Sequence, residues 1–354
     1  MKNCVRLLLF ILLSLCLVSN AFSQGLNADA MLYSEAGLEK DPSSLEDRPY
    51  DGTGSSYQQG SESLFWKEYN EGWTLQPYFA YKTFTFGLKN NDSGREVIYV
   101  PSTTMNLGFR TVYKGYGISL STAIPKEEDP DRGDSKYIDF QFSFLFNQHG
   151  FDFIYQQYKG FYIEDNDLKV AGKFLQYPDL VAAKFGFNYY YTFNSEFCLK
   201  AGYSQTARQL KDAGSWLIMG NMGIFSFSDP NDIIPPAYTG DFTDLTGLNG
   251  MRFSWIGASG GYGYSWIWDE WWLTASLFFG FNYVEQSYSI TSGTYEQSVP
   301  FNPKMNLKIS AGRHSDDRYY GISFFADNTI ASTNKSIEVG ANSFVVLFYY
   351  GWRL

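Results

Sequence analysis

Apolar and polar side chains alternate along most of the chain with a period of two residues. In the segment 137–147 (YIDFQFSFLFN), every second residue from Ile138 to Phe146 is apolar, and most of the residues between them are polar. Successive side chains of a β-strand point to opposite faces, so this segment places hydrocarbon on one face and polar groups on the other. The pattern is typical of transmembrane β-barrel strands, which contact lipid outside and water inside.

The alternation predicts about thirteen strands after Trp73. They lie at roughly 74–89, 102–113, 116–124, 136–147, 150–163, 180–193, 196–210, 214–227, 251–267, 271–287, 303–313, 318–328 and 336–353. A barrel formed by one bacterial chain has an even number of strands, so one assignment must be wrong. We expect the error in 228–250, because Pro235-Pro236 indicates a loop but Tyr238 to Leu245 could form a short strand. The sequence therefore predicts an all-β, antiparallel up-and-down transmembrane barrel of about 14 strands, with 12 as the alternative.

The predicted connections between strands alternate between short and long. Tight turns are expected at 114–115, 148–150 and 194–195, and short links recur at 268–270 and 314–317. Longer polar links lie at 90–100, 125–135, 164–179 and 288–302. Barrels of the outer membrane have short periplasmic turns and longer outer loops. Both ends of the barrel domain are therefore expected in the periplasm.

The first 72 residues differ from the rest of the chain. Residues 1–24 combine a basic start, an apolar stretch from Leu7 to Val18 and a small-residue exit, which indicates a cleaved signal peptide. That stretch is shorter than the ~20 residues of a spanning helix, which argues against a retained anchor. Residues 25–72 contain ten acids and three bases. This segment is expected to be a flexible, acidic periplasmic tail, followed by the barrel at 73–354.

The composition agrees with a membrane barrel better than with a soluble one. Aromatic residues make up 19% of the chain and charged residues only 18%. Tyr and Trp gather at membrane interfaces, and Phe fills the lipid band. A mean hydropathy of -0.26 is compatible with this, because half of each strand faces water. A soluble β-sandwich or closed barrel is the structural alternative. The net charge of -10 argues against a nucleic acid partner.

Three blocks of sequence resemble a bacterial outer-membrane β-barrel family known as domain of unknown function 4421. They are YKGYGISLSTAIP (113–125), KYIDFQFSF…HGFDFIYQQYKGFY (136–162) and FGFNYYYTFN…KAGYSQTARQLKDAGSW (185–216). GGYGYSWIWDEWWLTASL (260–277) is similar to a later hairpin of that family. The resemblance implies a Gram-negative envelope barrel, and it supplies no activity.

Few residues offer catalytic or metal-binding chemistry. His149 and His314 each lie in a tight turn predicted on the periplasmic rim, whereas a serine hydrolase site acting on outer-leaflet lipid would need its histidine at the other rim, so both are expected to be solvated turn residues. Cys198 is the one cysteine outside the predicted signal peptide, so the mature chain is expected to form no internal disulfide. We expect no metal, no cofactor and no enzymatic activity. A lipid-modifying enzyme is the minor alternative.

The segment 204–216 carries polar residues on both faces, which predicts an outward hairpin rising above the membrane. Arg208 and Lys211 could contact lipopolysaccharide phosphate or an anionic solute there, or simply be solvated. Gln157 and Lys159 form a second polar patch, expected beside the first, with an interfacial aromatic belt as the alternative.

Several charged residues are predicted to face the lumen, including Arg110, Asp139 and Lys184. Their mixed signs allow either a narrow, porin-like channel for small polar solutes or a structural barrel with a filled lumen. A surface binding protein that uses its loops and the 204–216 hairpin is the alternative function. Expected partners are outer-membrane lipid, lipopolysaccharide and the barrel-assembly machinery, whose C-terminal signal the terminal strand resembles. The oligomeric state is left open.

Overall fold

The computed structural model describes residues 64–69, 72–102, 105–113, 116–124, 130–146, 148–315, 317–332 and 337–354. All described residues belong to one compact unit, 58–354. The predicted signal peptide and most of the acidic segment 25–72 lie outside the described residues. The end of that segment is not a free tail, because residues 66–68 form a strand.

The described chain consists mainly of β-strands. They are β1 (Trp66–Glu68), β2 (Trp73–Asn90), β3 (Glu96–Val100), β4 (Met105–Tyr113), β5 (Tyr116–Ala123), β6 (Lys136–Leu145), β7 (His149–Ile163), β8 (Leu175–Thr192), β9 (Ala207–Gln209), β10 (Ala213–Ser228), β11 (Gly250–Trp268), β12 (Trp271–Ile290), β13 (Gly293–His314), β14 (Arg318–Ser332) and β15 (Ile337–Arg353). Short helical turns are η2 (Asn166–Leu168), η3 (Lys200–Ser204, a π-helix), η4 (Pro236–Tyr238) and η5 (Thr243–Leu245). No helix within the described part of the chain is long and apolar enough to cross a membrane.

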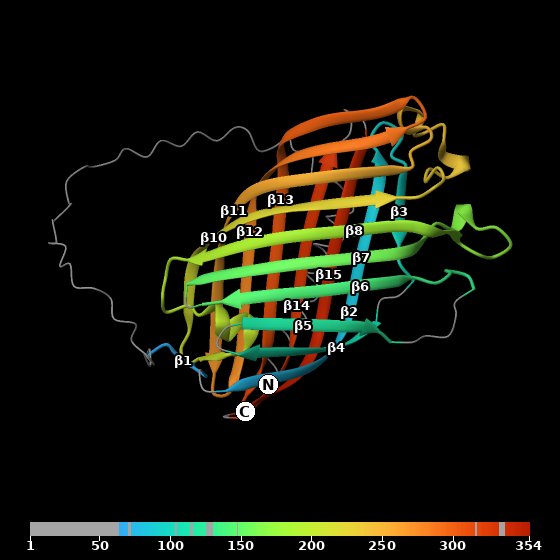
Figure 1. The fold of residues 1–354 in the computed structure, drawn as a ribbon. Helices are drawn as coiled ribbons and strands as arrows, with labels where there is room; N and C mark the ends of the chain where they lie inside the picture. Colours follow the sequence, from blue (N-terminus) through green and yellow to red (C-terminus); the bar gives the residue numbers. More distant parts are fainter. Residues whose placement is uncertain are drawn as a thin grey trace, which may run out of the picture. The chain divides into compact units, whose positions relative to one another are not determined.

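Thirteen strands form one antiparallel sheet that closes on itself (Figure 1). Neighbours in the ring follow chain order, and β15 pairs with β2 to complete it. Both β3 and β4 pair with β2, so they are two halves of one crossing. The described chain thus crosses the sheet twelve times. The predicted up-and-down barrel is confirmed. Its wall has 12 crossings, the alternative number, and not the 14 that the sequence favoured.

One of the thirteen predicted strands is absent, and it is not in the segment where the error was expected. Residues 228–250 contain no extra strand, only the turns η4 and η5. Instead, the predicted strand 196–210 was wrong, because this segment forms η3 and the short β9. Phe197, Cys198 and Leu199 are all buried. Three consecutive buried side chains do not fit a strand that exposes one face to lipid.

The two ends of the barrel differ in their connections. We call the end where β2 starts and β15 finishes the termini end, and the opposite end the loop end. The short links after β4, β6, β11 and β13 lie at the termini end, as predicted. The longer links after β5, β7 and β10 lie at the loop end. The predicted loop 288–302 instead extends β12 and β13 as a hairpin that turns at residues 291–292.

Fewer strands surround the loop end than the termini end. Near the loop end, β3 pairs directly with β7 through Tyr99 and Val100. The hairpin β5–β6 pairs only from Tyr116 to Leu120 on the β5 side, so it extends only part of the way. The loop end is therefore ringed by ten strands rather than twelve.

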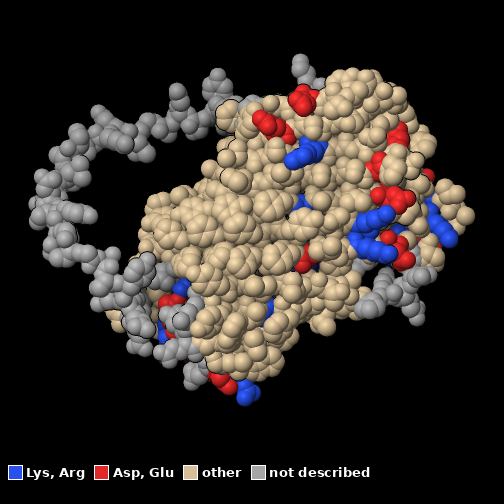
Figure 2. Space-filling model, viewed as in Figure 1, with Lys and Arg blue, Asp and Glu red and all other residues tan. Residues whose placement is uncertain are grey.

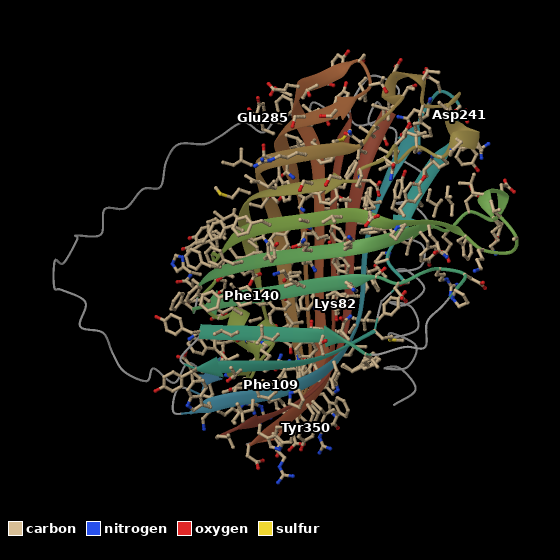
Figure 3. All side chains as sticks on the ribbon, turned by 45° about the vertical axis from the view of Figure 1, so that its right-hand side comes forward. Lys82, Phe109, Phe140, Asp241, Glu285 and Tyr350 are labelled. Atoms are coloured by element: carbon tan, nitrogen blue, oxygen red, sulfur yellow. The ribbon has the colours of Figure 1, made fainter. Side chains whose placement is uncertain are left out.

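An apolar band surrounds the barrel. On β12 the outward side chains run from Trp271 to Tyr283 without a charge, and Glu285 and Ser287 follow toward the loop end. Thirteen residues in a strand tilted by about 40° span roughly 30 Å, which matches a bilayer core. Phe109 and Phe140 point away from the barrel while Lys82 points into it (Figure 3). Uncharged side chains dominate the visible wall, and charged ones gather toward its loop end (Figure 2).

The apolar band makes a prediction for Phe279, which is 58% exposed near the middle of the band. Phe279→Lys should lower the free energy of unfolding by ~2–4 kcal/mol, because it buries a cation in hydrocarbon. Ser287→Lys, outward but beyond the band, should change it by less than ~1 kcal/mol. Denaturant titration of the barrel in lipid vesicles measures both. Equal effects at the two positions would contradict the assigned band.

Candidate functional site

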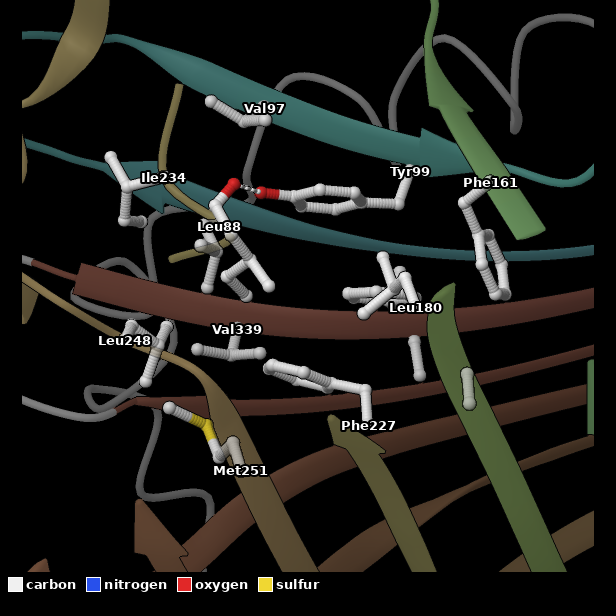
Figure 4. Close-up of a cluster of buried hydrophobic side chains, with 14 of the residues drawn as sticks. Leu88, Val97, Tyr99, Phe161, Leu180, Phe227, Ile234, Leu248, Met251 and Val339 are labelled. Carbon is white, nitrogen blue, oxygen red and sulfur yellow. Dashed lines mark hydrogen bonds between the residues drawn. The ribbon is translucent and has the colours of Figure 1, made fainter. Parts of the chain in front are cut away.

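The loop end of the barrel is filled by residues 229–249, which we call the loop-end plug. Its apolar side chains pack on inward side chains of the surrounding strands (Figure 4). The buried plug residues are Ile233, Ile234, Tyr238, Phe242, Leu245 and Leu248. On the strand side, Phe86 stacks on Tyr99 and on Phe227, with ring centroids 4.7 and 4.6 Å apart. The lumen at this end is therefore a hydrophobic core.

Hydrogen bonds fix the loop-end plug to the wall. The buried Tyr99 hydroxyl donates to the carbonyl of Ile233 at 2.5 Å (Figure 4). Tyr238 donates to the Asp165 carboxylate at 2.5 Å, which raises the pKa of the Tyr238 hydroxyl. Arg95 lies over the Tyr238 ring, 4.3 Å from its centroid. These bonds satisfy polar groups that the apolar packing would otherwise leave buried without partners.

The termini end is filled by a second group, the termini-end plug, which consists of residues 64–69 and 195–209. β1 pairs with β9, and the Trp66 indole donates to the carbonyl of Ser195 at 2.9 Å. A buried ion pair joins Glu68 to Lys200. The plug is attached to the barrel by Tyr203, whose hydroxyl lies 2.5 Å from that of Ser276. Residues 64–69 therefore contribute directly to filling the lumen at this end.

Between the plugs, buried ion pairs cross the lumen. Lys82 lies 2.6 Å from Asp139, and their side chains are 4% and 1% exposed. Gln156 donates to the same carboxylate at 3.1 Å. These residues come from β2, β6 and β7, and Asp139 and Gln156 are register partners on the adjacent strands β6 and β7. The pair therefore ties the short hairpin to the rest of the wall.

Two further groups of charges connect more distant parts of the wall. Lys184 of β8 lies 2.9 Å from Asp327 of β14, and Lys304 of β13 contacts the same carboxylate. Lys308 of β13 lies 3.1 Å from Asp152 of β7. The strands β8 and β14 are five positions apart in a ring of twelve, as are β7 and β13. Side chains from nearly opposite walls thus meet in the lumen. We call these four lysines and three aspartates the lumen network.

A cavity of about 170 Å³ lies beside the lumen network. Its charged lining residues are Lys82, Arg110, Asp152, Lys184, Lys308 and Asp327, and Phe278 is part of its apolar wall. We call it the central cavity.

The structure places the sequence-predicted lumen residues together. Arg110, Asp139 and Lys184 all lie inside the barrel, as their alternation predicted. Lys82, Lys304 and Asp327 were not among the lumen residues predicted from the sequence. The alternation of side chains along β2, β13 and β14 could have placed each of them in the lumen. It could not have shown which lysine pairs with which aspartate.

The two basic residues predicted on an outward hairpin lie at the other end of the barrel. Arg208 and Lys211 lie at the termini end, not on an outward hairpin at the loop end. Arg208 donates to the carbonyl of Asp269 at 3.2 Å, and Lys211 lies 5.4 Å from the ring of Phe65. The prediction was wrong because it treated residues 196–210 as a strand that crosses the barrel. These residues stay at the termini end, so β10 runs from the termini end to the loop end, opposite to the predicted direction.

The second predicted patch is on the outer wall of β7. Gln157 accepts a hydrogen bond from Tyr155 at 2.8 Å, and Lys159 lies 2.9 Å from Asp179. These residues occupy the half of β7 nearer the loop end. The two patches therefore lie toward opposite ends of the barrel and do not form one surface.

The two histidines have no catalytic partners among the described residues. His149 lies 2.9 Å from the Tyr189 hydroxyl, and His314 lies 2.7 Å from the Arg353 guanidinium. In the described part of the chain, no group of three His, Cys, Asp or Glu residues could hold a metal ion.

The closed antiparallel ring, its apolar outer band and its polar interior define a transmembrane β-barrel with the fold of outer-membrane proteins. The model of the family "Domain of unknown function (DUF4421)" matches residues 61–353, and the chain belongs to this family.

The solved structures to which the chain is similar are distant from it in sequence. No curated protein matches the chain. Among solved structures, the outer membrane protease OmpT from Escherichia coli aligns with a TM-score of 0.40 at 9% identity, covering 83% of this chain and 99% of OmpT. The toluene transporter TodX from Pseudomonas putida aligns with a TM-score of 0.27 at 8% identity, covering 80% of this chain and 90% of TodX.

The lumen network makes a prediction for stability. Asp139→Asn should destabilise the barrel by about 3–5 kcal/mol, because it leaves the Lys82 charge buried without its partner. The double variant Lys82→Met/Asp139→Leu should recover most of that loss. The matched control is Asp179→Asn, which breaks the half-exposed pair with Lys159 and should cost less than ~1 kcal/mol. Unfolding titrations in vesicles compare the three; a double variant as unstable as Asp139→Asn would argue against the mechanism.

The termini-end plug makes a prediction for Cys198. Burial raises the pKa of its thiol to about 12, so it is protonated and shielded at neutral pH. We expect maleimide to react with Cys198 at least ~100-fold more slowly in the folded barrel than in denaturant. Trp66→Ala should speed the reaction in the folded state by loosening the plug. A rate that is equally fast in folded and unfolded protein would show that residues 195–209 do not fill the lumen.

Proposed function

We propose that the protein is a non-enzymatic barrel of the bacterial outer membrane whose lumen is closed at rest. The observation that carries this proposal is the filling of both barrel ends by the chain itself, with ion pairs crossing the lumen between them. Of the two versions that the sequence allows, this geometry favours the structural barrel with a filled lumen over the open channel for small polar solutes.

We propose that the termini end faces the periplasm. The short links gather at that end, and outer-membrane barrels have short periplasmic turns. In this orientation the loop-end plug and the β12–β13 hairpin face the outside of the cell. Outward aromatic residues of β15, including Phe348 and Trp352, are then available to the assembly machinery and to lipid.

A surface-binding role receives less support from the geometry. Arg208 and Lys211 lie at the termini end, so in this orientation they are remote from lipopolysaccharide. An enzymatic role is also less favoured, because the described histidines contact Tyr189, Arg353 and aromatic rings rather than a serine or carboxylate. Incubation with labelled outer-membrane lipids, followed by thin-layer chromatography, tests for a lipid-modifying activity. A new lipid product would overturn the non-enzymatic proposal.

The closed lumen makes a prediction for conductance. The refolded barrel should show no ion current in planar bilayers, because a plug fills each end of the lumen. A variant with residues 231–248 replaced by a short Gly-Ser linker should remain silent, since the termini-end plug is still present. Removing residues 197–207 as well should produce conductance.

Two controls make the conductance experiment decisive. Each variant is first checked for folding by its heat-modifiable mobility in gel electrophoresis. A steady current through the unaltered barrel would contradict the closed lumen. Accelerated Cys198 labelling in the variant lacking only residues 231–248 would show that the two plugs are not independent.

A further inference from the structure

The wall of the central cavity carries an excess of positive charge. Lys184 of this wall pairs with Asp327, and the same carboxylate also contacts Lys304, which does not line the cavity, so the group of three keeps one positive charge. Arg110 donates to the backbone carbonyl of Tyr203 at 3.0 Å. Among the described residues, no carboxylate lies within ion-pair distance of the Arg110 guanidinium.

The other lumen charges balance each other. Lys82 pairs with Asp139, and Lys308 pairs with Asp152. Together with Arg110, the lumen network therefore has five cations and three carboxylates, a net charge of +2. A charge held inside a protein without a counter-charge is costly, so this interior favours an added anion.

Arg110 is the best-placed residue to receive that anion. Its guanidinium has five N–H donors in a planar fork that matches a carboxylate, and within the described part of the chain only the backbone carbonyl of Tyr203 accepts from it. Its side chain lines the central cavity together with Lys184. The cavity also offers an apolar surface, because Phe278, Phe325 and Leu347 line it.

The volume of the cavity sets the size of the ligand. It measures about 170 Å³. An engineered protein cavity of about 150 Å³ admits benzene, so the space suits one aromatic ring or a short alkyl chain. A bare inorganic anion would leave the apolar wall without a contact.

We propose that the central cavity is a binding site for a small organic carboxylate. The carboxylate is held by the Arg110 fork in the positive field of the Lys184–Lys304–Asp327 group, and its hydrocarbon part packs against Phe278 and Phe325. The site goes beyond the closed-barrel function and does not depend on it, because a ligand of this kind can occupy either a closed barrel or a conducting one.

Equilibrium dialysis with radiolabelled benzoate tests the proposal. The full barrel is refolded in detergent in the presence of the probe, so that entry does not depend on spontaneous opening. We expect saturable binding of one benzoate per barrel. Benzamide, its neutral analogue, and inorganic phosphate should each compete at least ~10-fold more weakly, because one lacks the charge and the other lacks the ring.

Variants connect the binding to the cavity. Arg110→Gln should weaken benzoate binding by ~10-fold or more. Lys184→Gln, which leaves Lys304 and Asp327 as a neutral pair, should weaken it several-fold and serves if the Arg110 variant does not fold. Lys159→Gln removes a cation from the outer wall and should leave binding unchanged. Absence of binding, equal competition by benzamide or phosphate, or unchanged affinity in both folded cavity variants would overturn the proposal.

Discussion

The structure depends on one constraint, that every backbone N–H and C=O within the bilayer must find a partner in the protein. A sheet meets this requirement only when it closes, and here the pairing of β15 with β2 from Tyr78 to Asn90 completes the ring. The interruption between β3 and β4 does not open the wall along its whole height, because β3 turns to pair with β7. Closure is thus kept although two short strands extend only part of the way.

Closure then determines what the interior must contain. A ring of this size encloses space that must be filled by side chains, by plug segments or by water. The chain uses a different solution at each level: an aromatic core around Phe86 and Phe227 at the loop end, the lumen network in the middle, and residues such as Trp66 and Cys198 at the termini end. Because Lys184 and Lys308 reach carboxylates on nearly opposite walls, the middle level also fixes the distance between those walls.

The sequence predicted the outside of the barrel better than its inside. Contact with lipid imposes a period of two residues on each strand, so the facing of Phe279 and Phe140 could be inferred directly. No such period governs the plugs. Phe197, Leu199 and Ala201 alternate with polar or small residues like a strand, yet they fold as a compact segment. Phe197 and Leu199 pack on inward residues of the wall, and Ala201 packs on Trp66 of the plug. The partners of lumen charges depend on the register around the ring, which alternation alone does not provide.

The glycine-rich part of β11 shows how the pairing register of the strands affects the packing of side chains in the lumen. Gly257 lies directly between Asn221 of β10 and Asn282 of β12, at a position that faces the lumen. A Cβ atom on Gly257 would overlap the Asn282 amide, so a glycine there lets two neighbouring amides share the space above it. The same row continues through Asn188 to Asp152, where the charged cavity begins. A row of neutral amides thus leads along the wall from Asn282 to Asp152, the first carboxylate of the lumen network.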